Sequence, residues 1–378
     1  MKFMHLSDLH IGKRVNEFSM LEDQKYILNQ ILSILDRTHV DGVILAGDIY
    51  DKPIPPAEAV QVFDAFLTEL ADRGVCVFAV SGNHDSAERL AFGSRLMDSR
   101  AVYFSPVYDG NVRCISLKDA YGSLCVHLLP FVKPAAVRRI YADEPIETYQ
   151  DAVRSAVSHM KIDSSVRNLL IAHQFVTGAA RCDSEEVLVG GLDNVDASVF
   201  DAFDYVALGH IHSPQHVGRE TIRYSGTPLK YSFSEAGQEK SVTIVECRQK
   251  GSMVLMEIPL KPLRDLRKIR GTYQEVTDLS HCPENAREDY VHITLTDEED
   301  VIDGLSKLRV IYPNLMRLEY DNRRTRENRD ITLTEEIERK SELELFQEFY
   351  ELQNNQPMTG KQEAYMAHLI EERKEECM

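Results

Sequence analysis

The sequence predicts an α/β protein with a parallel sheet, a small second α+β domain and a helical tail. Three observations support this prediction. Short apolar, β-branched runs alternate with helical apolar spacing over residues 1–80. A basic stretch at 261–270 precedes a second, shorter set of strand and helix patterns, and helical periodicity returns beyond an arginine-rich break at 323–329. The expected domains are 1–262, 271–322 and 331–378.

The composition limits the class of protein. An apolar content of 43% suits a globular chain with sizeable cores. The 7 cysteines are scattered without a Cys-x-x-Cys pair, which favours a reducing cytoplasm over a disulfide framework. No apolar run approaches the ~18 residues of a membrane span, so we expect a soluble cytoplasmic protein. The net charge of −18 opposes nucleic-acid binding without excluding it, because bound cations or a basic partner would offset it.

The first domain opens with alternating strands and helices. The expected strands are Lys2–Ser7, Val43–Ala46 and Val75–Val80. Apolar residues at helical spacing over 21–35 and 60–70 predict the two intervening helices. This β-α-β-α-β order predicts parallel strands joined by right-handed crossovers.

Shorter elements complete the first domain. Thr148-x-x-Asp151 has the form of a capping box and is expected to open a helix that reaches Met160. The runs at 112–117 and 124–129 are expected to add antiparallel strands. Further strands are expected at 102–104, 168–172, 205–208, 222–225, 241–246 and 253–258.

The rest of the chain is expected to form the two smaller parts. Residues 261–270 are interpreted as a linker because of their Lys and Arg content. The small domain is expected to have a helix near 301–308 and strands at 272–276, 291–295 and 315–320. The acidic tail is expected to form a helix over 337–352, which Thr332-x-x-Glu335 would cap, and a last helix beyond a break at 354–357.

Polar side chains follow five of the predicted strands. Asp8 and His10 stand two residues apart, as do His210 and His212, so each pair points to one side of an extended backbone. Three more residues arrive singly from other strand ends, namely Asp48, Asn83 and His173. Because chemistry collects at the carboxyl ends of strands in open α/β sheets, we expect these side chains to form one site.

The residue types point to a metal centre. Carboxylate, imidazole and amide oxygen suit divalent ions such as Mn²⁺, Fe²⁺ or Zn²⁺, and the absence of thiolate disfavours a structural zinc site. Seven candidate ligands are too many for one ion. They suit two ions that one carboxylate and a water bridge.

The chain resembles the calcineurin-like metallophosphoesterases. The matching motifs are Asp8-x-His10, Gly47-Asp48-x-x-Asp51, Gly82-Asn83-His84-Asp85, His173 and Gly209-His210-x-His212. This resemblance implies a β-sandwich flanked by helices, followed by a capping domain that contacts DNA. The stretches 82–86, 173–178 and 225–235 are similar to those of nuclease subunits that work with an SbcC-type coiled-coil ATPase.

The resemblance also implies roles for single residues. Asp8, His10, Asp48 and His212 would hold one metal, and Asp48, Asn83, His173 and His210 would hold the other. His84 would face the scissile phosphate, where a protonated imidazole stabilises charge and donates to the leaving oxygen. Its expected orienting partner is Asp51, with Asp85 as the alternative. Lys13, Arg14 and Arg89 flank the motifs and are candidates for contacts with DNA phosphates or simply surface charges.

The implied activity is that of a Mn²⁺-dependent DNA nuclease, with Mg²⁺, Fe²⁺ or Zn²⁺ as alternative ions. It would act as a double-strand exonuclease and a single-strand or hairpin endonuclease in DNA repair, recombination and replication. The tail 331–378 would bind the ATPase, and two copies of the chain would form a homodimer within a heterotetramer at the nucleoid. The alternatives are a phosphoesterase acting on small molecules or proteins, and a scaffold with a relict site.

Overall fold

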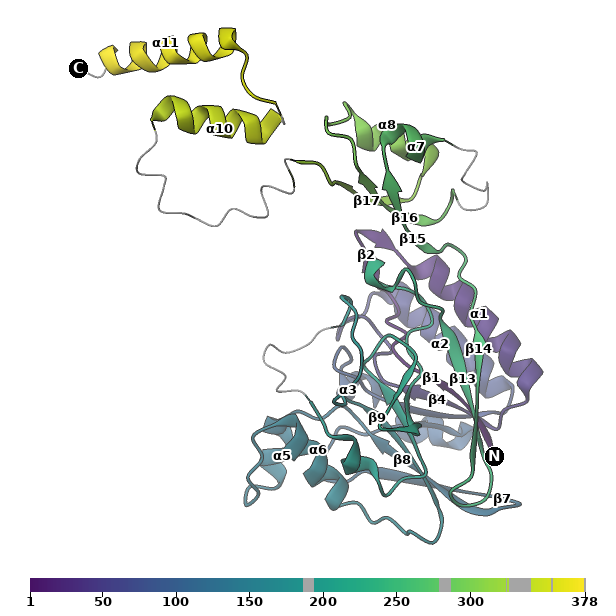
Figure 1. The fold of residues 1–378 in the computed structure, drawn as a ribbon. Coiled ribbons are helices and arrows are strands. Elements are labelled where there is room, and N and C mark those ends of the chain that lie inside the picture. The colour runs from purple at the N-terminus through teal and green to yellow at the C-terminus, as the bar shows by residue number, and fades with distance from the viewer. Residues whose placement is uncertain (186–193, 279–286, 324, 326–340, 355, 377–378) are drawn as a thin grey trace. The chain divides into compact units, whose positions relative to one another are not determined.

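The structure is a computed structural model that describes residues 1–378 except 186–193, 279–286, 324, 326–340, 355 and 377–378 (Figure 1). The chain divides into two units, Met1–Asp265 and Leu266–Met378. Among the described helices, none combines the length and the apolar character needed to cross a membrane. The candidate site lies within the first unit.

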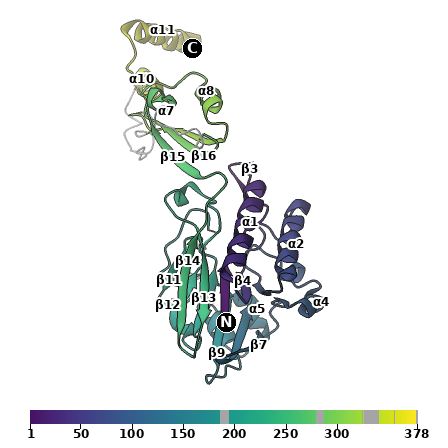
Figure 2. The same cartoon turned by 90° about the vertical axis from the view of Figure 1, so that its right-hand side faces the viewer.

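The first sheet has the strand order β14-β13-β1-β4-β5-β6. Its strands are β1 (Lys2–Leu6), β4 (Gly42–Ala46), β5 (Cys76–Val80), β6 (Val102–Phe104), β13 (Ser241–Cys247) and β14 (Met253–Pro259). β1, β4, β5 and β6 are parallel, whereas β13 runs antiparallel to β1 and β14. The connecting helices α1 (Leu21–Thr38) and α2 (Ala57–Asp72) lie side by side (Figure 2). The predicted β-α-β-α-β order is therefore confirmed.

The second sheet has the strand order β11-β12-β10-β9-β8-β7. Its strands are β7 (Arg113–Asp119), β8 (Gly122–Leu129), β9 (Arg167–His173), β10 (Tyr205–Gly209), β11 (Gln215–Val217) and β12 (Arg219–Tyr224). The four central strands are parallel, and the edge strands β7 and β11 are antiparallel to their neighbours. The hairpin of β7 and β8 agrees with the expected antiparallel pair, whereas β11 is not predicted by the sequence.

The remaining elements of this unit are short. They are the hairpin β2 (Arg14–Val15) and β3 (Phe18–Ser19), the helices α3 (Ala87–Leu90), α4 (Ser94–Met97), α5 (Pro134–Ile140) and α6 (Tyr149–Ser158), and the 3₁₀ turns η1 (Asp98–Arg100), η2 (Ala197–Phe200) and η3 (Phe233–Glu235). The predicted capping box of α6 is present: the Thr148 hydroxyl accepts from the Asp151 amide at 3.2 Å, and the Asp151 carboxylate accepts from the Thr148 amide at 3.0 Å.

The two sheets pack face to face around one apolar core. It contains fully buried residues of both sheets, among them Phe3, Ile44 and Phe78 from the first and Val126, Leu169 and Tyr205 from the second. A second core lies between the other face of the second sheet and the helices α5 and α6, and it includes Val137, Val153, Leu170 and Val206. The first unit is thus a β-sandwich flanked by helices, which confirms the expected fold class.

The small domain differs from the sequence prediction at its start. Its parallel sheet has the order β15-β16-β17, with β15 (Leu266–Gly271), β16 (Tyr290–Leu295) and β17 (Leu315–Tyr320), and it carries helices α7 (Tyr273–Thr277) and α8 (Gly304–Ile311). The predicted strand at 272–276 is wrong, because a Thr272/Glu275 capping box starts α7 there. The linker expected at 261–270 is also partly wrong, since the sheet begins at Leu266, ahead of the expected start at residue 271.

Two helices are described in the tail. α10 (Glu342–Asn354) and α11 (Gly360–Glu376) lie on either side of the predicted break, and Gln362 Nε2 donates to the Tyr350 hydroxyl at 2.8 Å. Leu345 and Phe349 of α10 are 36% and 57% exposed, so this apolar stripe is open to solvent. The expected cap Thr332-x-x-Glu335 lies outside the described residues.

Candidate metal centre

Five strand ends meet at one edge of the sandwich. β1 leads into Asp8 and His10, β4 into Asp48, and β5 into Asn83. From the second sheet, β9 ends at His173, and β10 leads into His210 and His212. Together with His84, these side chains form overlapping groups in which potential metal-binding atoms lie within 4.8 Å of one another: Asp8 with His10 and His212, His10 with Asp48 and His84, and Asp8 with Asp48 and His173.

The backbone is constrained where it presents these side chains. Asp8, His10, Asp48 and His210 all have left-handed φ values, of 52°, 44°, 47° and 101°. Such conformations are costly for residues with a Cβ and cluster at functional sites. Main-chain hydrogen bonds join the loop after β1 to the loop after β4. They run from Asp8 N to Gly47 O at 3.0 Å and from His10 N to Asp48 O at 2.9 Å.

Two glycines are required by close approach. A Cβ at Gly209 would lie 1.9 Å from the Ala46 carbonyl oxygen, and a Cβ at Gly82 would lie 2.1 Å from Asp48 Oδ1. Any side chain would therefore push the strand ends apart. These glycines allow the two sheets to bring their ligands within reach of the same space.

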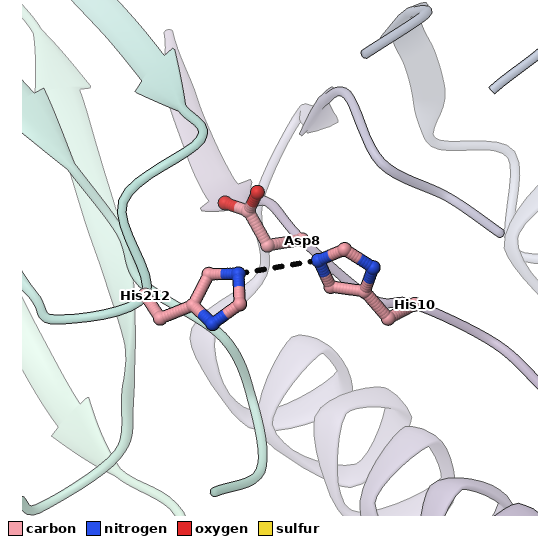
Figure 3. Close-up of side chains that lie close together, drawn as sticks. All are labelled: Asp8, His10 and His212. Atoms are coloured by element: carbon pink, nitrogen blue, oxygen red, sulfur yellow. Dashed lines mark hydrogen bonds between the residues drawn. The ribbon is translucent and has the colours of Figure 1, made fainter. Parts of the chain in front are cut away.

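Asp8, His10 and His212 form the first ligand group (Figure 3). The Nε2 atoms of the two imidazoles face each other at 3.2 Å, and all three side chains are buried. Two buried imidazole nitrogens at this distance need a shared proton or a bound cation between them. His10 Nδ1 is also buried without a hydrogen-bond partner, and it lies 3.7 Å from Asp51 Oδ1.

Asp48, Asn83, His173 and His210 lie together in a second cluster of candidate ligands. Asp48 Oδ2 lies 3.2 Å from His173 Nε2, and the Asn83 side-chain oxygen lies 2.9 Å from the same nitrogen and 3.0 Å from His210 Nδ1. The other nitrogen of His173, Nδ1, lies 2.8 Å from the Ala46 carbonyl oxygen. Because a carbonyl only accepts, Nδ1 carries a hydrogen, and Nε2 is the nitrogen presented to the centre.

His84 lies at the rim of this centre. Its main-chain N–H donates to Asp48 Oδ1 at 2.9 Å, and its Nε2 lies 4.0 Å from Asp48 Oδ2. Its Nδ1 donates to the main-chain carbonyl of Asp51 at 3.1 Å. The structure therefore brings Asp51 to His84 through the main chain, while the Asp51 carboxylate accepts from Lys13 Nζ at 2.8 Å.

Asp85, the alternative partner for His84, has a different set of contacts. Its carboxylate accepts the main-chain N–H groups of Ile49 at 3.1 Å, Tyr50 at 3.0 Å and Gly82 at 3.0 Å. Burial, together with the nearby charge of Asp48, raises the pKa of Asp85 to about 6. These contacts clamp the loop after β4 to the loop after β5, which positions Asp48 and Asn83 relative to each other.

Burial and charge set the protonation of the histidines. Burial lowers the pKa of His10 well below its ordinary value and that of His210 to about 3. For His173, burial alone would lower the pKa, but the charge of Asp48 and their hydrogen bond raise it to about 9. The same contact lowers the pKa of Asp48 despite the burial of its carboxyl.

The donor set fits divalent cations. Buried neutral imidazoles and an ionised carboxylate are the forms that ligate metal, and the three ligand groups found among the described residues contain no cysteine. The facing Nε2 atoms of His10 and His212 also fit a cation, which both nitrogens could ligate.

The candidate DNA contacts have different surroundings. Lys13 is tied to Asp51 and lies 5.7 Å from the centre of the Tyr231 ring. Arg14 is exposed, and its guanidinium donates to the Glu17 carbonyl. Arg89 is exposed in α3 and lines a cavity of about 310 Å³ beside α2.

Sequence reasoning missed the residues that support the ligands. Gln24 Nε2 donates to the His10 carbonyl at 2.7 Å, and Ser184 Oγ lies 2.7 Å from His212 Nδ1. The Glu185 carboxylate accepts the main-chain N–H of His212, and the Glu235 carboxylate accepts from the Ser184 hydroxyl. Glu235 stands in the stretch 225–235, which the sequence marks only through its resemblance to a family.

Comparisons with known proteins agree with this geometry. A family model described as calcineurin-like phosphoesterase matches residues 1–214, and the SbcD_C model, described as type 5 capsule protein repressor C-terminal domain, matches residues 262–354. The chain is 32% identical over 374 residues to SbcD, a subunit of the nuclease SbcCD, from Staphylococcus epidermidis, and the match covers 98% of each chain.

Two solved structures are more distant. A dimetal phosphatase from Danio rerio has a TM-score of 0.44 at 13% identity, over 69% of this chain and 98% of its own. The E. coli phosphoesterase YfcE has a TM-score of 0.29 at 13% identity, over 69% of this chain and 100% of its own. The family assignment rests on the sequence matches. By those matches the chain belongs to the calcineurin-like phosphoesterases, in the SbcD branch of that family, and is a metal-dependent phosphodiesterase.

Proposed function

We propose that the chain is the nuclease subunit of a DNA-processing enzyme and hydrolyses phosphodiester bonds with two bound divalent cations. The observation that carries the proposal is the position of Asp48. Its Oδ2 lies 3.2 Å from His173 Nε2 and 3.7 Å from His10 Nε2, so one carboxylate reaches both ligand groups. That DNA is the substrate is supported by the relative from Staphylococcus epidermidis, whose name is that of a nuclease.

Asp8, His10, Asp48 and His212 would hold the first cation, and Asp48, Asn83, His173 and His210 the second. The grouping of Asp8 with His10 and His212 supports the first set, and the Asn83 oxygen between His173 and His210 supports the second. Mn²⁺ is the proposed ion, with Mg²⁺, Fe²⁺ and Zn²⁺ as alternatives, because oxygen and imidazole donors suit these ions.

The chain's own residues then act on the substrate. Bound cations of this kind polarise a phosphoryl oxygen and lower the pKa of a bound water. His84 is held by the Asp51 carbonyl through Nδ1, which leaves Nε2 to face the scissile phosphate. From there it stabilises the developing charge and donates a proton to the leaving oxygen. Lys13 is placed by Asp51 at the same rim, where it and the exposed Arg14 and Arg89 would contact DNA phosphates.

The proposed activities are double-strand exonuclease and single-strand or hairpin endonuclease cleavage, in DNA repair, recombination and replication in the cytoplasm at the nucleoid. The small domain would add DNA contacts. Its strand β15 carries Arg267, Lys268 and Arg270, of which Lys268 and Arg270 are exposed. A basic strand of this kind suits a phosphate backbone.

The proposed partner is an SbcC-type coiled-coil ATPase bound through 331–378. The support from the structure is the exposed apolar stripe of α10, on which Leu345 and Phe349 are open to solvent. Helices that keep apolar residues exposed are suited to lie in a groove of another protein. Packing of this tail on its own unit is the competing interpretation.

We also propose that two copies associate as a homodimer within a heterotetramer. Large apolar side chains are exposed beside α2, with Ile54 at 72%, Phe92 at 83% and Leu96 at 81%. Val60 and Phe92 line the same cavity of about 310 Å³. An exposed apolar cluster of this kind is typical of a surface that a partner covers.

The decisive experiment compares two substrates. Purified chain, with Mn²⁺ and with or without the ATPase, is given linear duplex DNA and a generic small phosphodiester. Hydrolysis of DNA that the ATPase stimulates supports the proposal. Turnover of the small phosphodiester without DNA cleavage would favour a phosphoesterase of other substrates, and no turnover of either would favour a scaffold.

A further inference from the structure

Side chains from two distant segments hold the main chain and the ring Nδ1 of His212. Its main-chain N–H donates to Glu185 Oε1 at 2.7 Å, and its carbonyl accepts from Lys240 Nζ at 2.8 Å. Its ring Nδ1 lies 2.7 Å from Ser184 Oγ. His173, by contrast, is oriented by a main-chain carbonyl, that of Ala46.

The direction of these hydrogen bonds follows from Glu235. Its carboxylate is fully buried, and Ser184 Oγ donates to Glu235 Oε1 at 2.6 Å. A serine hydroxyl has one hydrogen, so a hydroxyl that donates to Glu235 can only accept from His212. Nδ1 of His212 must then carry the hydrogen, and Nε2 keeps its lone pair. That lone pair faces the centre, 3.2 Å from His10 Nε2.

Lys240 keeps the Glu235 carboxylate ionised, so that it can only accept the hydrogen bond from Ser184. Its ammonium group lies 2.6 Å from Glu235 Oε2, and both side chains are almost completely buried. Its other hydrogen bonds go to the His212 carbonyl and to Gln238 Oε1 at 2.9 Å. An ammonium has three donors, so all of them are used, and a buried carboxylate paired in this way stays ionised and only accepts.

We propose that Ser184, Glu235 and Lys240 form a positioning relay that fixes His212 in the Nδ1–H tautomer and presents its Nε2 to the first cation. The inference rests on the proposed role of His212 as a ligand. Hydrogen bonds behind a ligating histidine orient the ring and increase its basicity, and their loss typically weakens metal binding by about 10–100-fold. The Ser184 hydroxyl lies between the Glu235 carboxylate and the His212 ring. Replacing Ser184 with alanine removes this one oxygen atom and therefore tests the relay.

The first measurement is calorimetric titration of the metal-stripped, full-length chain with Mn²⁺. Ser184→Ala is expected to weaken the binding of one ion by about 10–100-fold, and Ser184→Thr, which keeps the hydroxyl, to restore it. The matched control is Ser99→Ala, because the Ser99 hydroxyl donates to the Leu96 carbonyl in a surface turn. This control is expected to bind as the wild type does.

The second measurement reads the tautomer without metal. The ¹⁵N shifts of the His212 ring, assigned by comparison with His212→Ala, are expected to show a protonated Nδ1 in the wild type. In Ser184→Ala they are expected to move toward the Nε2–H form. Wild-type shifts and wild-type affinity in Ser184→Ala would overturn the relay.

His212→Ala also separates the relay from the metal centre on which it depends. Normal binding of both ions by this variant would remove His212 from the ligand set, and the proposed metal centre would need revision. Loss of one ion in His212→Ala, with normal binding and an unchanged tautomer in Ser184→Ala, would leave the centre intact and reject the relay alone.

Discussion

Asp48 Oδ2 lies 3.2 Å from Nε2 of His173, and almost nothing of either side chain is exposed. The two residues come from different sheets, since Asp48 follows β4 and His173 ends β9. The other carboxylate oxygen of Asp48 accepts the main-chain N–H of His84 at 2.9 Å. This one side chain therefore connects three strand ends, and removing it is the most direct test of the centre.

Asp48→Ala is expected to lose both metal ions. Without a bridging carboxylate, two close cations would repel each other with nothing between them to offset the repulsion. Metal content is measured by mass spectrometry after dialysis against Mn²⁺. The control is Asp64→Ala, which removes an exposed carboxylate from α2. Full occupancy in Asp48→Ala would reject the bridge.

His84→Ala is expected to keep both ions and to lose nuclease activity by a factor of about 10²–10⁴, because it removes a proton donor and no ligand. Cleavage of linear duplex DNA and metal content are measured on the same preparation. His216→Ala, which alters an exposed histidine of β11, serves as the control. Should His84→Ala lose its metals, His84 would have to be counted as a ligand.

Deletion of residues 331–378 is expected to abolish capture of the ATPase while Mn²⁺ binding and basal nuclease activity remain. Phe349→Glu in the full-length chain is expected to weaken capture as well, because Phe349 is 57% exposed on α10. Capture is measured by pull-down with the purified ATPase. Undiminished capture by the truncated chain would refute the docking proposal, and collapse of the truncated chain would favour packing of the tail on its own unit.

Phe92→Glu combined with Leu96→Glu is expected to halve the molar mass of the particle in light scattering. Charges placed in an apolar contact between two copies would remain buried and unpaired. Ile302→Glu on the segment before α8 is the control, because it changes a similarly exposed apolar side chain outside the cluster. An unchanged mass in the double variant would place the dimer contact elsewhere.

Asp119→Asn is expected to lower the free energy of unfolding at pH 7 by about 1.5–3 kcal/mol, the usual range for a hydrogen bond to a charged group. The buried Arg167 guanidinium donates to Asp119 Oδ2 at 3.0 Å, and this hydrogen bond lowers the pKa of the Asp119 carboxyl. Urea unfolding, followed by circular dichroism, measures the difference between the variant and the wild type.

The same pair predicts a dependence on pH. A carboxyl whose pKa is lowered by folding contributes its stability in full above the pKa of the unfolded chain, about 3.9. That contribution is lost as pH falls from there toward the lower pKa of the folded protein. The difference between Asp119→Asn and the wild type should therefore shrink below about pH 4. A difference that stays constant down to about pH 3 would contradict the role of this charge.

The sequence by itself determined the parallel order of β1, β4 and β5 and the strand ends that present Asp8, Asp48 and His173. These features are local, because apolar runs, glycines and residue spacing encode them within a few positions. The start of the small domain was mispredicted for a related reason. The exposed Lys268 and Arg270 of β15 made this stretch resemble a linker, although Leu266 of the same strand is buried.

The tertiary structure alone decided how the candidate ligands are supported. Asp51 reaches His84 through its carbonyl, and nothing in its side-chain type signals this contact. Ser184 and Glu235 are far apart in the sequence, but both lie near His212. The 182–185 turn and η3 come together beside the end of β10. Hydrogen-bond direction in such a cluster depends on which partners are buried together, and only packing brings those partners into contact.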